Sequence, residues 1–237
     1  MNLSVIIIEY FDLNLAVQNS KIIRELLTKD DEIILSSNSV YSKEFTNRNI
    51  NNFEYFDSVI FNSKNGGFAY AINSAIDKSS NEILIILNSD AKPVVLDKKR
   101  IIRVFKDRHV GIIGPKIKDQ NNEIQNSRRK FFSLKSVLSR LINPVDSHEY
   151  INSSEFYEVD WVIGCCMILR KNSLTHFDER YFLYVEDMDI CRKFTENGYK
   201  VYADNNIEFE YKGDRKSRQS FFSVYKFIHL KSLMKYF

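Results

Sequence analysis

The chain contains the stretch Glu82-Ile-Leu-Ile-Ile-Leu87, which is followed directly by Asn88-Ser89-Asp90. A short apolar run closed by polar turn residues is typical of a buried strand. Leu3 to Ile8 has the same character, and it precedes a segment with apolar residues at helical spacing. We therefore expect strands and helices to alternate, which predicts an α/β fold with a mostly parallel central sheet flanked by helices.

Further elements are expected from the same patterns. The expected strands are Glu32 to Leu35, Val110 to Ile113 stopped by Gly114 and Pro115, and a core strand from Val159 to Leu169. The expected helices are Gly67 to Ile76, a short one around Leu134 to Leu141, and one from Glu186 to about Asn197 ended by Gly198. Residues 119–158 are expected to form a partly helical excursion over the site.

Length and composition set limits on the class of protein. The 237 residues are 44% hydrophobic and 27% charged, which suits one α/β domain. No stretch approaches the roughly 18 uninterrupted apolar residues of a membrane span, so we expect a cytoplasmic protein. The cysteines, Cys165, Cys166 and Cys191, lack metal or redox spacing and are expected to be buried. The basic residues form no broad face, which argues against a nucleic-acid partner.

The first candidate site follows the strand at Leu87. Parallel sheets bind ligands at the carboxyl ends of their strands, and a carboxylate there, here Asp90, can hold a divalent cation against phosphate oxygens. The alternative is a simple turn, because Asn, Ser and Asp are common wherever strands end.

The second candidate is Phe182-Leu-Tyr-Val-Glu186-Asp187-Met-Asp189, in which three carboxylates open a helix. Acids in a first turn complement the helix dipole, which explains one or two of them. Capping does not explain why Glu186 and Asp187 directly follow an apolar and aromatic segment. This arrangement would place a carboxylate at the edge of a pocket, where it could act as a base. The third candidate, Asn65-Gly66-Gly67-Phe68, offers backbone amides at a helix start but lacks the spacing of a dinucleotide site or a phosphate-binding loop.

In this order, the motifs resemble glycosyltransferase family two, the inverting enzymes of the GT-A fold, and within it the bacterial rhamnosyltransferase-like branch. The stretches that carry the resemblance are Ser4 to Tyr10, Asn65 to Asn73, Leu87 to Asp90, Val159 to Arg170 and Phe177 to Arg192. A GT-A (Rossmann-like) domain over residues 1–211, followed by a C-terminal helical tail over 212–237, is therefore expected.

The resemblance implies a metal-dependent hexosyltransferase that moves a sugar, such as the deoxyhexose rhamnose, from a dTDP- or UDP-linked donor. The implied acceptor is a glycan or polyprenyl-linked glycan in bacterial surface polysaccharide or lipopolysaccharide synthesis. Asp90 would hold Mg²⁺ or Mn²⁺, and Asp187 would be the catalytic base, with Glu186 beside it. The implied donor-binding residues are Tyr10, Asn38, Asn65, Asn88, Ser89, Arg128 and Arg129, and the implied acceptor-binding residues are Trp161, Gly164 and Glu186.

Two departures from the family pattern leave an alternative open. The family usually has Thr before the Tyr and Asp before the Asn of its first two loops, where this chain has Glu9 and Ser37. Many members also place a metal-binding histidine after the last core strand, and Ile207 to Gly213 contains none. The alternative is a non-catalytic protein of the same fold that binds nucleotide or a partner transferase. A sugar-phosphate nucleotidyltransferase is disfavoured, because it needs a glycine-rich basic loop near the N-terminus.

The tail is basic and amphipathic. Phe221, Val224, Tyr225 and Ile228 follow helical spacing, with Lys226, Lys231 and Lys235 interleaved. Such a helix can lie on an anionic membrane surface, which predicts peripheral contact with the inner face of the cytoplasmic membrane. The alternative is a terminal helix packed on the domain or on a second subunit in a homodimer.

Overall fold

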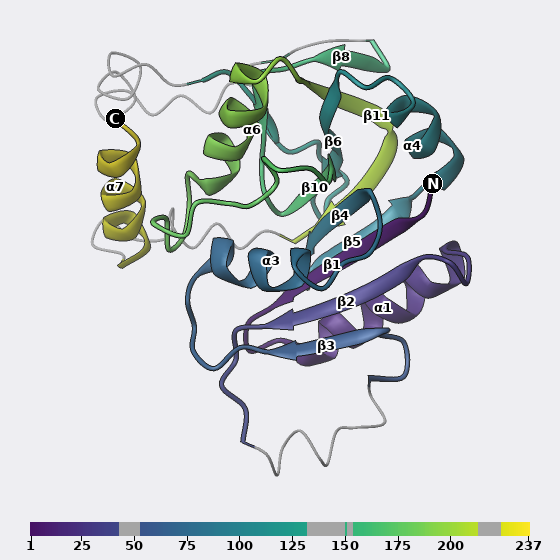
Figure 1. Cartoon of the computed structure of the whole chain (residues 1–237), viewed down its shortest axis with the longest axis vertical. Coiled ribbons are helices and arrows are strands. Elements are labelled where there is room, and N and C mark those ends of the chain that lie inside the picture. The colour runs from purple at the N-terminus through teal and green to yellow at the C-terminus, as the bar shows by residue number, and fades with distance from the viewer. Residues whose placement is uncertain (43–52, 132–149, 151–153, 213–223) are drawn as a thin grey trace.

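Figure 1 shows a computed structural model of the chain, and it describes residues 1–42, 53–131, 150, 154–212 and 224–237. The strands are β1 (Leu3–Glu9), β2 (Glu32–Ser37), β3 (Ser58–Phe61), β4 (Ile83–Asn88), β5 (Ala91–Val95), β6 (Val110–Lys118), β7 (Arg128–Arg129), β8 (Phe156–Glu158), β9 (Trp161–Val162), β10 (Cys166–Arg170) and β11 (Lys200–Tyr211). The helices are α1 (Leu13–Leu26), α3 (Phe68–Ile76), α4 (Lys98–Phe105), α6 (Glu186–Glu196) and α7 (Val224–Tyr236).

One large sheet organises the molecule. Its strand order is β3-β2-β1-β4-β10-β6-β11-β5, and β8 pairs with β11. Strands β1 to β4 are mutually parallel, and β11 is parallel to β6. Strand β10 lies between β4 and β6 and is antiparallel to both. The predicted α/β fold with a mostly parallel central sheet is confirmed.

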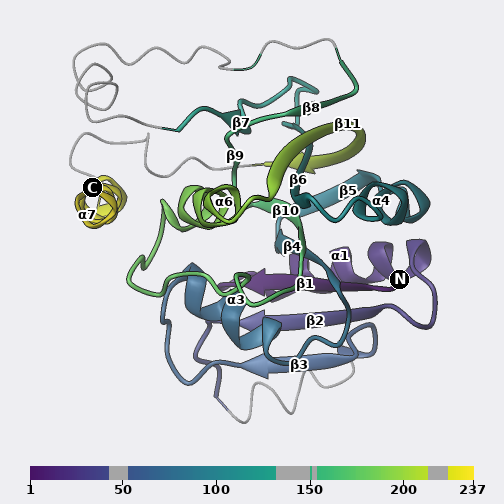
Figure 2. The same ribbon diagram turned by 45° about the horizontal axis from the view of Figure 1, so that its top comes forward.

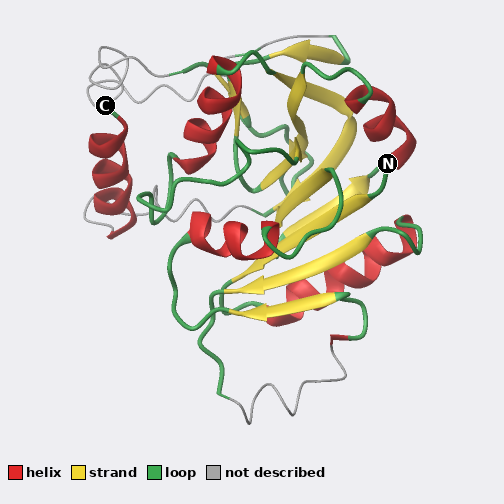
Figure 3. Cartoon of the chain, in the orientation of Figure 1, coloured by secondary structure: helices red, strands yellow, loops and turns green. Residues whose placement is uncertain are grey.

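Helices cover both faces of this sheet (Figures 2 and 3). On β1, Ile6 and Ile8 belong to the core that contains α3 and α6, whereas Val5 and Ile7 belong to the core that contains α1 and α4. Successive side chains of a strand point to opposite faces, so one uninterrupted apolar run supplies both cores. This is why the buried strands could be predicted from their composition.

The prediction that Gly114 and Pro115 stop a strand is wrong, because β6 continues through them to Lys118. Pro115 pairs with Asp204 just where the register between β6 and β11 shifts, so its missing N–H falls at an irregularity of the ladder. Gly114 leaves room for Val162, whose Cγ1 would lie 2.3 Å from a Cβ atom at position 114.

The predicted strand from Val159 to Leu169 is also wrong, because it is two strands in two sheets. β9 pairs with β7 in a small separate sheet, and β10 belongs to the large one. Between them, the amide of Ile163 donates to the carbonyl of Ser127 at 3.1 Å. The amide of Gly164 donates to Asp187 instead of a neighbouring strand. An apolar composition alone does not reveal where a chain changes sheets.

Two further expectations, the helix from Glu186 and the burial of the cysteines, are confirmed. α6 begins at Glu186 and ends at Glu196, and Gly198 follows with a φ of +83°. The three cysteines are buried and form no disulfide.

The helix expected at Leu134 to Leu141 and the tail residue Phe221 lie outside the described residues. Among the residues that the structure describes, no helix has the length and apolar character needed to cross a membrane.

The C-terminal helix α7 packs on the domain next to α6 (Figure 1). Leu233 and Tyr236 contact the core that contains α3 and α6, and Ser232 is buried. The guanidinium of Arg192 in α6 lies 4.5 Å from the ring centroid of Tyr236. Of the two arrangements left open for the tail, packing on the domain is therefore present in the fold, and the opposite face of α7 stays exposed.

Candidate active site

The candidate residues converge where the parallel strands end. The pairing of Glu9 with Ser37 and of Ile8 with Asn88 brings the carboxyl ends of β1, β2 and β4 to one edge of the sheet. The amide of Asn88 donates to the carbonyl of Cys165 at 2.9 Å, which brings the turn before β10 to the same edge. From that turn, Gly164 reaches the start of α6.

The thiol of Cys165 links the two acidic motifs. Burial raises its pKa well above 9, and the negative charges of Asp90 and Asp187 raise it further. The hydrogen bonds agree, because the carbonyl of Cys165 accepts from the amide of Asn88 and the adjacent Gly164 donates to Asp187, although the two acidic motifs lie far apart in the sequence. The two motifs that the sequence singled out therefore meet at one edge of the sheet.

Asp187 is held in a fixed orientation at the start of α6. Its Oδ2 accepts a hydrogen bond from the amide of Gly164, and its Oδ1 accepts one from the amide of Met188, both at 2.9 Å. Burial raises the pKa of Asp187, while these amides and the positive charge of Arg129 lower it. The half-buried carboxylate is therefore held by two backbone amides, and its pKa lies above that of an exposed aspartate.

A glycine is needed at position 164 because its backbone approaches Asp187 closely. A Cβ atom at position 164 would lie 3.0 Å from the ring of Phe68 and 3.3 Å from Cβ of Asp187. The backbone amide can therefore approach the carboxylate only because no side chain intervenes. This gives Gly164 a positioning role, whereas its predicted contact with an acceptor stays a prediction.

Glu186 differs from its neighbour. Its side chain is buried, and among the described residues its Oε2 has no hydrogen-bond partner. Burial and the adjacent charge of Asp187 raise the pKa of Glu186 well above 4.5. Two adjacent carboxyl groups in one desolvated site do not both ionise readily, so Glu186 is the one that keeps its proton.

The protonation of Glu186 predicts a pH dependence of stability. The folded state binds a proton that the unfolded chain releases near pH 4.5, so the free energy of unfolding falls as pH rises from about 4.5 through the raised pKa. The limiting slope is about 1.4 kcal/mol per pH unit. Glu186→Gln, which mimics the neutral acid, is expected to remove this loss.

Urea midpoints at pH 5 and pH 8 measure the effect. The native chain is expected to lose more stability between these two pH values than Glu186→Gln. An equal loss in both proteins would show that Glu186 ionises normally in the folded state.

Asp90 lies half-buried at the mouth of β4, next to a tyrosine. The hydroxyl of Tyr211 accepts a hydrogen bond from Nδ2 of Asn88 at 3.2 Å. Burial raises the pKa of Tyr211, and the negative charge of Asp90 raises it further, so the phenol stays neutral. Tyr211 lies in the stretch where many members of the family that the sequence resembles have a metal-binding histidine. In this chain Tyr211 supplies a neutral hydroxyl near Asp90.

No group of three or more His, Cys, Asp or Glu side chains in the described part of the chain could hold a metal ion. A single partly exposed carboxylate nevertheless fits Mg²⁺ or Mn²⁺ when the ligand's own diphosphate and water complete the coordination shell. Asp90 has this position at the strand end. Ser89, by contrast, is buried, and its carbonyl accepts from Nδ2 of Asn19 at 2.6 Å.

The two residues that depart from the family pattern in the first loops, Glu9 and Ser37, are hydrogen-bonded to each other. The buried carboxylate of Glu9 accepts hydrogen bonds from the hydroxyl groups of Ser37, Ser39 and Tyr41 and from the amide of Asp12. Compared with the family pattern, the acid and the hydroxyl have exchanged strands, and in this chain the two side chains are joined by a hydrogen bond. Three of these donors reach Oε1 and one reaches Oε2, and they come from both loops, so Glu9 orders these loops.

The predicted donor-binding residues fall into two groups by exposure. Tyr10 is 53% exposed at the end of β1 and can offer its ring to a ligand. Asn38 is buried, donating to the carbonyl of Gly67 at 2.9 Å and accepting from Asn62 at 3.1 Å. Oδ1 of Asn65 accepts from the amide of Gly67 at 3.1 Å. Asn38 and Asn65 thus order the loop before α3.

The two predicted arginines lie on opposite faces of β7. Arg128 is buried, and its Nη1 donates to the hydroxyl of Tyr157 at 3.5 Å. Arg129 lies 5.5 Å from the ring centroid of Trp161, and its charge acts on Asp187 and on His229 of α7. Arg129 is therefore the one at the site. His229 and α7 were not assigned to the site from sequence, because no motif surrounds them.

Comparison with known proteins agrees with this geometry. Residues 4–177 match the profile of the family described as glycosyl transferase family 2. The chain therefore belongs to glycosyl transferase family 2.

The curated relatives have names that give a more specific activity, but their alignments cover a smaller part of the chain. The chain is 28% identical over 102 residues to an N-acetylglucosaminyl-diphospho-decaprenol L-rhamnosyltransferase of Mycobacterium tuberculosis, covering 38% of this chain and 33% of that protein. It is 33% identical over 84 residues to rhamnosyltransferase WbbL of Escherichia coli K12, covering 33% of this chain and 30% of that protein. The alignments thus span about a third of the curated relatives.

Among solved structures, the fold resembles GalNAc-T7 with UDP, GalNAc and Mn²⁺. The TM-score is 0.64 at 16% identity, covering 89% of this chain and 44% of that one. At this identity the likeness supports the GT-A fold.

Proposed function

We propose that this chain is an inverting glycosyltransferase that moves a sugar from a nucleotide-diphosphate donor to a glycan acceptor. The observation that carries the proposal is the meeting of the two acidic motifs at the turn before β10, where the carbonyl of Cys165 accepts from the amide of Asn88 and the amide of Gly164 donates to Asp187. In this proposal Asp187 acts as the base, and Asp90 would hold the metal ion that binds the diphosphate.

In this mechanism Asp187 accepts the proton of an acceptor hydroxyl. The hydroxyl oxygen attacks the anomeric carbon and forms the new glycosidic bond, while the bond from that carbon to the nucleotide diphosphate breaks. Attack from the face opposite the leaving group inverts the anomeric centre. The amides of Gly164 and Met188 hold the base in place, and Arg129 beside it adds positive charge at the site.

Asp90 would hold Mg²⁺ or Mn²⁺ against the donor diphosphate. When bound, such an ion neutralises negative charge that develops on the leaving group. Tyr10 would stack on the nucleotide base, while Asn38, Asn65 and Glu9 order the surrounding loops.

The donor and acceptor classes are supported by the relatives. Both are rhamnosyltransferases, and the name of the mycobacterial one includes a diphospho-decaprenol acceptor. We therefore propose a deoxyhexose donor such as dTDP- or UDP-linked rhamnose and a polyprenyl-linked glycan acceptor in bacterial polysaccharide or lipopolysaccharide synthesis.

Release of nucleoside diphosphate from UDP-, dTDP- and GDP-sugars, with Mn²⁺ or Mg²⁺, tests the proposal. One donor is expected to be turned over, and Asp90→Ala is expected to reduce turnover about a hundredfold by removing charge stabilisation of the leaving group. Metal-dependent binding of the free nucleoside diphosphate should weaken in the same variant. A native protein that neither binds nor hydrolyses any of these donors would favour the non-catalytic alternative.

A further inference from the structure

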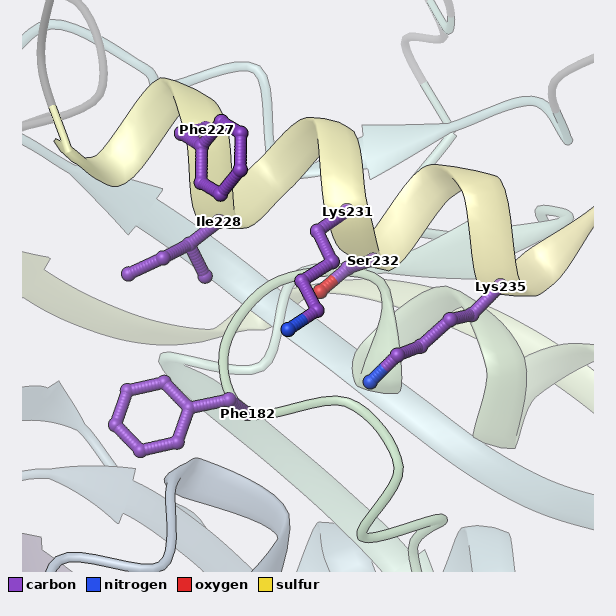
Figure 4. Close-up of a pocket in the computed structure, with 6 residues that line it drawn as sticks. All are labelled: Phe182, Phe227, Ile228, Lys231, Ser232 and Lys235. Atoms are coloured by element: carbon purple, nitrogen blue, oxygen red, sulfur yellow. The ribbon is translucent and has the colours of Figure 1, made fainter.

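A pocket of about 290 Å³ lies between α7 and the loop that leads to α6 (Figure 4). Its volume is near the lower end for small-ligand pockets. The lining residues are Phe182, Phe227, Ile228, Lys231, Ser232 and Lys235. None of the sequence motifs discussed above explains this pocket.

The lining combines two kinds of chemistry. Phe182, Phe227 and Ile228 are apolar, whereas Lys231 and Lys235 are cationic, and no acid is among the lining residues. In Figure 4 the two ammonium groups extend from α7 toward the loop. Such a surface is complementary to an anion that carries an apolar chain.

The pocket is built on a fixed frame. The hydroxyl of Ser232 donates to the carbonyl of Leu183 at 2.9 Å, and the ammonium of Lys235 donates to the carbonyl of Arg180. The ring centroids of His229 and Tyr184 lie 5.1 Å apart. These contacts fasten α7 to the loop before Glu186. Lys231 has no ion-pair partner among the described residues and is exposed, so its charge is available to a ligand.

Direct contacts connect the pocket with the catalytic edge. The carbonyl of Phe182 accepts a hydrogen bond from the amide of Phe68 at 2.9 Å. The ring of Phe68 lies against Gly164, whose amide binds Asp187. The pocket-lining residue Phe182 is therefore connected to the proposed base through Phe68 and Gly164.

The exposed face of α7 extends the apolar side of the pocket. Its exposed apolar residues, including the one that follows the helix, are Val224, Phe227, Leu230, Met234 and Phe237. They recur at helical spacing along a single stripe. An apolar chain leaving the pocket would meet this stripe instead of water.

We propose that this pocket binds the isoprenoid diphosphate of a lipid-linked acceptor, with Lys231 and Lys235 on the diphosphate and Phe182 and Phe227 on the first isoprene units. The assignment rests on the proposed function and adds a subsite to it. The sugar joined to that diphosphate would extend toward Asp187.

Farnesyl diphosphate, a short isoprenoid diphosphate, tests the pocket directly by titration calorimetry in EDTA. Native protein is expected to bind it, and Lys231→Glu is expected to weaken binding tenfold or more, the loss of about one charge-assisted contact. Phe227→Ser should also weaken it. Lys21→Glu is the matched control, because it makes the same charge change at an exposed position of α1. It should leave the affinity for farnesyl diphosphate unchanged.

Three outcomes would overturn the assignment. In the first, Lys231→Glu binds farnesyl diphosphate as tightly as native protein. In the second, inorganic diphosphate binds as tightly as farnesyl diphosphate, which would indicate a bare anion site. In the third, Lys231→Glu loses only its binding to phosphatidylglycerol vesicles, which would make α7 a membrane-contact helix. Acceptor-free donor turnover by the native protein tests the transferase proposal separately, so failure of the pocket and failure of the transferase proposal remain distinguishable.

Discussion

Asp187→Asn is expected to lower the rate of glycosyl transfer about a thousandfold while leaving donor binding nearly unchanged. The change removes the proton acceptor but keeps the size of the side chain, and general-base catalysis typically contributes a factor of this order. An asparagine oxygen can still accept from the amide of Gly164 or Met188. The test is kcat for transfer to an acceptor, measured together with the affinity for the nucleoside diphosphate.

Asp189→Asn is the matched control for this substitution. Asp189 lies two residues further along the first turn of α6 and accepts a hydrogen bond from the hydroxyl of Tyr181 at 3.3 Å. It carries the same charge but has no contact with Gly164, so its loss should reduce the rate by much less. Equal losses in the two variants would mean that charge at the helix start matters, and that Asp187 is not the base.

The fold could be predicted from sequence where a strand is buried on both faces of the sheet. Ile6 and Ile8 on one face of β1, with Val5 and Ile7 on the other, leave an uninterrupted apolar run in the sequence. Strand ends were less predictable. Pro115 lies inside β6 because a register shift makes its missing N–H harmless, and that shift depends on β11, ninety residues away.

The site could be predicted where a motif carries its own local geometry. Asp187 opens a helix and Asp90 closes a strand, so their neighbours in sequence already position them. Pairings across the sheet could not be predicted in this way. Glu9 and Ser37 each looked like an isolated departure from the family pattern, and only the fold shows that the two side chains are hydrogen-bonded to each other. Likewise, adjacent arginines look equivalent in sequence, but β7 directs only Arg129 to Asp187.

Gly67→Ala is expected to destabilise the protein by about 3 kcal/mol, from backbone strain combined with a steric clash. Gly67 has a φ of +96°, in the region that favours glycine. A Cβ atom there would lie 2.2 Å from the carbonyl oxygen of Phe182, which is the acceptor of the amide of Phe68. The free energy of unfolding from urea titration measures the loss.

Gly198→Ala separates the two causes of this loss. Gly198 also has a left-handed φ, +83°, but a Cβ atom there would have no neighbour within 4 Å. Its substitution should cost about 1 kcal/mol, the backbone contribution alone. If Gly67→Ala costs no more than Gly198→Ala, the contact with Phe182 is unimportant. A larger cost, with loss of donor turnover, would show that Gly67 holds the donor loop against the segment that carries Asp187, because its carbonyl also accepts from Asn38.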